Sequence, residues 1–143
     1  MIEQGIIGGV CTTHAPQLWT LPDSEDPKVV KRLKTLLSEI GKNLTEMKPD
    51  ICIVIANDNA HQFLLHCNAS FTIHIGGSDE GNFEGRNYKY PVASKEALEL
   101  VRYAQRNNFD PAFTSNAKID YALGIPLDFT GIKNIPILPI FVN

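Results

Sequence analysis

One run of apolar residues, followed at once by a polar cluster, constrains the fold of this chain most strongly. The run covers residues 51–56, and four of its six members are isoleucine or valine. Such a run is typical of a strand buried on both faces, as in a parallel sheet. The polar residues 57–61 would then emerge at the carboxyl end of the strand, where open α/β sheets bind their ligands.

Two further predicted strands also lead into polar loops. Residues 5–11 run into the loop that contains His14, and residues 111–114 lead toward Asp120 and Tyr121. The carboxyl ends of parallel strands lie along one edge of a sheet. If the sheet is parallel, His14, the polar cluster and the Asp120–Tyr121 pair share one rim, and the function depends on the chemistry of that rim.

The strongest helix signal lies between the first two of these strands. Asp26 is a good N-cap, and Pro27 suits the first helical position. Apolar residues then follow the helical period up to Met47, with lysine and glutamate on the other face. We therefore expect a helix over residues 27–47, which would complete a right-handed β-α-β unit.

Weaker patterns complete the expected order of elements. They predict strands at 71–75, 110–114 and 135–142, a helix capped by Ser94, a long loop over 76–90, and a helical turn over 120–128 broken at Gly124 and Pro126. The length of 143 residues suits a single domain over residues 1–143. The expected fold class is α/β, with a mostly parallel twisted sheet flanked by helices.

Composition argues against several classes of function. The net charge is −3 and no run of basic residues occurs, so nucleic-acid binding is not expected. No apolar run approaches the roughly 18 residues of a membrane span, and the first residues do not resemble a secretory signal. Cys11, Cys52 and Cys67 lack the spacing of a metal site. We therefore expect a cytoplasmic protein with reduced thiols and no membrane association.

The residue types at the predicted rim also have ordinary structural roles. A histidine in a turn, such as His14, commonly bonds to a backbone carbonyl. The Asn57-Asp58-Asn59 cluster can be a plain turn, because these side chains bond to their own backbone. Tyr121 can serve packing alone. Residue chemistry by itself leaves the structural and the functional interpretations open.

Several short blocks, taken in order, resemble one known family. They include Gly9–Pro16 (GVCTTHAP), Lys48-Pro49-Asp50 with the strand that leads to Asn57-Asp58, Ile119–Ala122 (IDYA) and Ile135–Asn143 (IPILPIFVN). Together they are similar to the amino-terminal part of the class III extradiol ring-cleaving dioxygenases. That family includes the catalytic subunit of protocatechuate 4,5-dioxygenase and the dihydroxyphenylpropionate dioxygenases. Its fold is an α/β sheet with helices on both sides, in agreement with the fold expected above.

The resemblance implies a non-haem Fe(II) held by two histidines and one glutamate. His14 matches the first metal histidine. The second belongs directly after Asn57-Asp58, where this chain has Asn59, and His61 is an alternative ligand close by. The family's glutamate belongs beyond Asn143. A neutral amide is a weak iron ligand, so Fe(II) is expected to bind weakly or not at all.

The resemblance also implies an acid/base histidine directly after Asp120, where this chain has Tyr121. A tyrosine with its ordinary pKa near 10 can donate a proton at neutral pH but is a poor base. Asp120 and Tyr121 are therefore the candidate catalytic residues. Thr13 and Asp58, which flank the metal positions, are candidate binding residues for a small catecholic ligand.

These departures favour a diverged or truncated family member that is inactive as this chain alone. An alternative is a non-catalytic subunit or small-molecule binding module that pairs with a complete chain. A third is that the sequence is one part of a longer protein. The strand predicted at 135–142 offers apolar side chains to both faces. We therefore expect a homo-oligomer or a partner subunit, with this strand and its neighbours in the interface.

Overall fold

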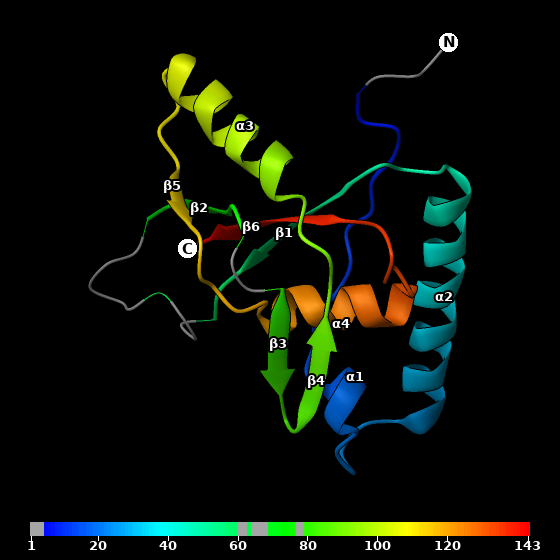
Figure 1. Cartoon of the computed structure of the whole chain (residues 1–143). Helices are drawn as coiled ribbons and strands as arrows, with labels where there is room; N and C mark the ends of the chain where they lie inside the picture. The colour runs from blue at the N-terminus through cyan, green and yellow to red at the C-terminus, as the bar shows by residue number, and fades with distance from the viewer. Residues whose placement is uncertain (1–4, 60–62, 64–68, 77–78) are drawn as a thin grey trace.

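The computed structural model describes residues 5–59, 63, 69–76 and 79–143. Figure 1 shows the elements in their spatial arrangement. In chain order they are α1 (Gln17–Thr20), α2 (Pro27–Glu46), β1 (Cys52–Asn57), β2 (Phe71–His74), β3 (Glu80–Phe83), β4 (Arg86–Lys89), α3 (Ser94–Arg106), β5 (Ala112–Thr114), α4 (Tyr121–Thr130) and β6 (Ile137–Val142). Among the described residues, no helix is long and apolar enough to cross a membrane.

A four-stranded sheet forms the centre of the fold, with strand order β1-β6-β2-β5. β1 runs parallel to β6, and β2 runs parallel to β5. The middle pair, β6 and β2, is antiparallel. The predicted fold class, α/β with a mostly parallel sheet and flanking helices, is therefore confirmed.

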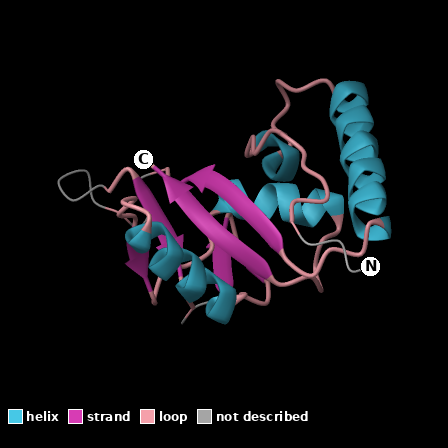
Figure 2. Ribbon diagram, turned by 90° about the horizontal axis from the view of Figure 1, so that it is seen from above, coloured by secondary structure: helices cyan, strands magenta, loops and turns pink. Residues whose placement is uncertain are grey.

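Each face of the sheet carries a helix. On one face, Leu123 and Leu127 of α4 belong to a buried cluster with Ile137 and Phe141 of β6. On the other face, α3 packs against Ile73 and Leu138, and Figure 2 looks down on this side. The α3 helix lies over one side of the sheet, and no helix stands in front of β1 in that view.

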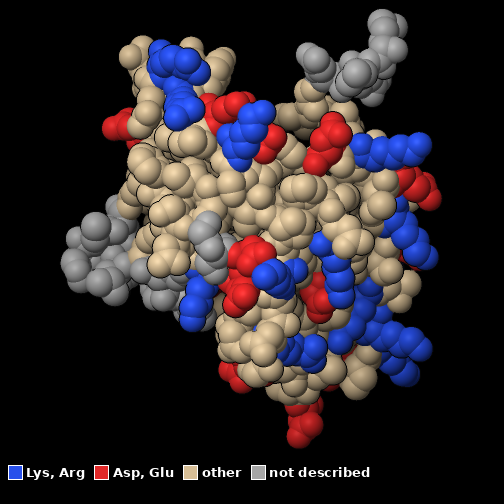
Figure 3. Space-filling view, viewed as in Figure 1, with Lys and Arg blue, Asp and Glu red and all other residues tan. Residues whose placement is uncertain are grey.

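The long helix α2 packs against α4 rather than on the sheet. It begins as predicted, because the Asp26 carboxylate accepts a hydrogen bond from the Lys28 amide at 2.8 Å and Pro27 occupies the first turn. Figure 3 shows lysine and arginine side chains gathered along this helix. The Lys34 ammonium lies 5.0 Å from the centre of the Phe129 ring, which ties the two helices together.

The strand predicted at residues 5–11 is absent, so the expected β-α-β unit does not form. Three glycines weaken strand formation there. Ile6 is 93% exposed. The prediction that β1 is buried on both faces is also wrong, because β1 is an edge strand and its exposure alternates along the chain. Six apolar residues in a row indicated a strand correctly but did not reveal how many neighbours it has.

The long loop predicted over 76–90 contains the β3–β4 hairpin. Its turn uses Glu84 and Gly85, both in the left-handed region with φ of 48° and 74°. The strands are short and polar, so hydrophobic periodicity did not indicate them. The α4 helix, in turn, continues through Gly124 and Pro126. Proline removes only one hydrogen bond of the helix, and buried residues on several sides hold the helix in place.

The strand predicted at 135–142 is confirmed in outline as β6, but its predicted openness is wrong. β6 pairs with β1 on one side and with β2 on the other. Ile137, Leu138 and Phe141 are almost completely buried between α4 and α3. Most of the strand is therefore covered within the chain, with only Ile140 and Val142 partly exposed, and the prediction of an oligomer loses much of this support.

Candidate functional site

Asp120 joins two loops that are distant in the sequence. It is the N-cap of α4, and its Oδ1 accepts a hydrogen bond from the Ala122 amide at 2.7 Å. The same oxygen accepts a second hydrogen bond, at 3.1 Å, from the side-chain amide of Asn59. Asp120 is only 3% exposed. The loop after β1 and the start of α4 therefore meet at one buried carboxylate, although the predicted rim of parallel strand ends does not form, because β1 and β5 run in opposite directions.

Asn59 is fixed at both ends of its side chain. Its Nδ2 donates to Asp120, and its Oδ1 accepts a hydrogen bond of 2.5 Å from the side chain of Asn57. Its backbone is left-handed, with φ of 52°, a conformation that asparagine tolerates better than most residues. The amide oxygen, which is the atom that could bind a metal, is thus already engaged.

Asp58 points into the fold and is completely buried. Its Oδ2 accepts a hydrogen bond of 2.9 Å from the backbone amide of Phe63. The Phe63 ring packs edge-on against Phe141 in the main core. Asp58 therefore fastens the loop after β1 to the sheet, and its predicted role toward substrate stays a prediction.

His14 and Tyr121 approach each other at the same place. Their ring centres are 6.4 Å apart, and Tyr121 also packs on Phe83 with ring centres 4.3 Å apart. Burial, together with the negative charge of Asp120, raises the pKa of the Tyr121 phenol above its usual value. The phenol is therefore protonated at neutral pH and can donate a hydrogen bond. Thr13, beside His14, accepts a hydrogen bond from the Ala15 amide at 3.1 Å and is exposed.

An aromatic wall that the sequence analysis missed lies behind Tyr121. Trp19 of α1 packs on Phe83 and Tyr88 of the hairpin, with ring centres 6.2 and 5.4 Å apart. The Arg86 guanidinium lies 5.8 Å from the centre of the indole ring. The lone tryptophan of the chain was a possible signal, but the hairpin that meets it was not predicted.

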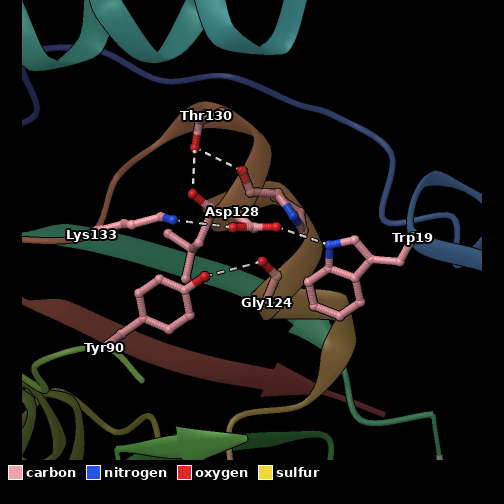
Figure 4. A network of polar contacts seen from close by, with 8 residues as sticks. Trp19, Tyr90, Gly124, Asp128, Thr130 and Lys133 are labelled. Atoms are coloured by element: carbon pink, nitrogen blue, oxygen red, sulfur yellow. Dashed lines mark hydrogen bonds and ion pairs between the residues drawn. The ribbon is translucent and has the colours of Figure 1, made fainter. Parts of the chain in front are cut away.

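Figure 4 shows how this wall is tied to α4. The Trp19 indole donates to Asp128 at 3.0 Å, and Lys133 forms an ion pair with the same carboxylate at 3.4 Å. The Tyr90 hydroxyl donates to the carbonyl oxygen of Gly124 at 3.3 Å. A side chain at position 124 would collide with the Tyr88 ring, because an added Cβ would lie 2.9 Å from it. Gly124 thus permits the hairpin to pack against α4.

One buried tyrosine, Tyr90, and one half-buried tyrosine, Tyr88, make the fold sensitive to high pH. Burial raises the pKa of Tyr88 and Tyr90 well above the usual range, and the charges of Asp120 and Asp128, respectively, raise them further. An unfolded tyrosine loses its proton near pH 10. Above that pH the unfolded chain binds fewer protons than the folded one, so stability falls by up to about 1.4 kcal/mol per pH unit for each tyrosine.

We therefore expect the melting temperature to drop steeply once the pH exceeds about 10. Thermal melts followed by circular dichroism between pH 8 and 11 measure this. The Tyr88→Phe, Tyr90→Phe double variant should show a shallower decline, because phenylalanine has no proton to lose. Parallel declines in both proteins would contradict the assignment.

The described donors do not fit a resident iron ion. Over the described part of the chain, no three histidine, cysteine, aspartate or glutamate side chains gather in a group that could hold a metal. His14 is one candidate ligand, and the neutral amide oxygen of Asn59 already accepts one hydrogen bond from Asn57. His61, the alternative ligand, lies outside the described residues.

Comparison with known protein families assigns this chain to one of them. The family described as "Catalytic LigB subunit of aromatic ring-opening dioxygenase" matches residues 8–143. The chain belongs to this LigB family.

The curated relatives are longer enzymes at low identity. The chain is 24% identical over 137 residues to the 2,3-dihydroxyphenylpropionate/2,3-dihydroxicinnamic acid 1,2-dioxygenase of Klebsiella pneumoniae subsp. pneumoniae. It is 20% identical over 135 residues to the enzyme of the same name from Escherichia coli O139:H28. In both comparisons the match covers 93% of this chain but 42% of the relative. The chain thus spans less than half the length of these enzymes.

Proposed function

We propose that this chain forms one side of the catechol-binding pocket of a LigB-type dioxygenase and does not open the aromatic ring by itself. The observation that carries the proposal is the hydrogen bond between Asn59 and Asp120. It brings the loop after β1 to the start of α4, beside the His14–Tyr121 ring pair. The same contacts hold Asn59 in a position where its oxygen serves the protein rather than a metal.

Each residue at the rim has a proposed role toward a catechol. The Tyr121 phenol donates a hydrogen bond to one catechol oxygen, because a tyrosine is protonated at neutral pH. The imidazole of His14 bonds to a second hydroxyl group, and Phe83 flanks the ring. Asp120 is a positioning residue, since it fixes the start of α4 and with it Tyr121.

We do not propose an iron site formed by this chain alone. His14 is the one family ligand that the described residues keep, and the amide at Asn59 is neutral. We propose that Fe(II) binds to this chain weakly or not at all. We also propose that the chain is cytoplasmic. The alternative is a binding module that pairs with a complete dioxygenase chain. The two differ in metal content, because a bound metal ion that depends on His14 would favour a working site.

Trp19 provides the test of ligand binding, because it is the only tryptophan and its ring lies 6.2 Å from Phe83. We expect 2,3-dihydroxyphenylpropionate to change its fluorescence in a saturable titration. Tyr121→Phe should weaken binding by about tenfold, the value of one hydrogen bond of roughly 1.4 kcal/mol. Tyr103→Phe, on the exposed face of α3, is the matched control and should bind as the parent does.

Two results would contradict the proposal. The absence of a saturable fluorescence change would show that the chain does not bind this catechol. Formation of the ring-opened product by the purified chain, measured by its absorbance, would show that the chain is active alone.

A further inference from the structure

One edge of the sheet carries an unusually unprotected strand. Among the described residues, β1 pairs with β6 alone, so its other edge presents free backbone groups. In natural proteins, a lysine, a proline or a bulge in an edge strand normally prevents it from pairing with a strand of another molecule. β1 (Cys52–Asn57) contains neither of these residues and no charge. The edge is therefore a template for pairing with another strand.

The same strand also leaves apolar side chains uncovered. Ile53 pairs in register with Leu138, and Ile55 pairs with Ile140, so both isoleucines point to the α3 face of the sheet. Leu138 is 3% exposed beneath α3, whereas Ile53 and Ile55 are 52% and 64% exposed. We call these two side chains and the free edge of β1 the β1 surface. α3 ends short of it, as Figure 2 shows.

The β1 surface lacks two different kinds of cover. Parallel strands such as β1 and β6 are normally covered on both faces by helices, and an open edge is completed by a further strand. A second copy of the chain, paired edge to edge, would supply a strand. It would leave Ile53 and Ile55 of both copies bare, because strand addition does not cover a face. A segment that brings both a strand and an apolar helix fits better.

The length of the relatives indicates where such a segment comes from. The matched part is 42% of the Klebsiella pneumoniae enzyme, so more than half of that enzyme lies outside the match. We propose that the β1 surface docks a polypeptide segment of the kind that forms the unmatched part of these relatives, through an added strand and an apolar helix. This inference extends the proposed function, because it names the partner of the catechol-binding side.

The test is co-expression, so that neither piece has to fold without the other. The tagged chain is produced together with the part of the Klebsiella pneumoniae enzyme that lies outside the match. We expect the two to co-purify as a one-to-one complex. Ile55→Asp should reduce the recovered partner at least tenfold. Val29→Asp, at a residue of α2 that is 63% exposed, is the matched control and should not change the recovery.

Measurements on the isolated chain make the result specific. Ile55→Asp should leave its melting temperature unchanged, because the side chain is exposed there. A dimer of the chain alone by light scattering, lost with Ile55→Asp, would assign the surface to a second copy and overturn the proposal. Failure of the partner to co-purify, or co-purification that ignores Ile55→Asp, would also overturn it. These readouts report binding between chains, so they fail independently of the catechol titration.

Discussion

Replacing Gly41 by alanine is expected to lower the free energy of unfolding by about 3 kcal/mol, the upper end of the usual cost of overpacking. Gly41 lies in α2 where that helix crosses the end of α4 and is buried. A Cβ atom at this position would lie 1.8 Å from the carbonyl oxygen of Thr130 and 2.6 Å from its carbonyl carbon. These are backbone atoms, so no side-chain rotation can relieve the collision, and the two helices must move apart.

The direction of this effect is diagnostic. In an exposed helix, the change from glycine to alanine is stabilising by roughly 0.5–1 kcal/mol. A large loss of stability therefore reports the close crossing of α2 and α4 rather than helix propensity. Urea denaturation followed by circular dichroism measures it. Gly9→Ala is the control, because nothing lies within 4 Å of a Cβ added there. Equal stability of the Gly41→Ala variant and the parent would mean that the helices lie farther apart.

Local signals in the sequence predicted local structure well. The Asp26-Pro27 start and the apolar period fixed α2, because capping and amphipathicity depend on neighbouring residues only. The run at 51–56 indicated β1, but its place at the edge depends on which strands pair with it. That pairing is a property of the whole fold. The same limit explains why β6 was expected to be open and is instead largely buried.

The candidate site, too, could be predicted from the sequence only in part. The Asn59 hydrogen bond brings the loop after β1 to Asp120. The expected reason was wrong, because β1 and β5 run in opposite directions in the sheet and their carboxyl ends do not share an edge. The aromatic wall was not predictable, because Phe83 and Tyr88 belong to a polar hairpin without a strand pattern. The roles of the rim residues toward metal and substrate stay predictions.

Replacing Asp120 by alanine is expected to cost about 2–4 kcal/mol of stability. Loss of an N-cap alone costs about 1 kcal/mol, and a buried donor left without its acceptor costs roughly 1–3 kcal/mol more. Here the Ala122 amide and the Asn59 side chain both lose the same oxygen. Asp26→Ala removes an exposed N-cap from α2 and should cost only about 1 kcal/mol, so it is the matched control.

Asp120→Asn separates geometry from charge at this position. Asparagine is as good an N-cap as aspartate, and its Oδ1 can accept both hydrogen bonds, so most of the stability should remain. The negative charge is lost, however, and with it one cause of the raised pKa of Tyr121 and Tyr88. Tyrosine ionisation followed by absorbance should therefore shift to lower pH in this variant, while chemical denaturation shows little change. If asparagine and alanine destabilise the protein equally, the carboxylate charge, rather than the cap and the Asn59 contact, holds the rim together.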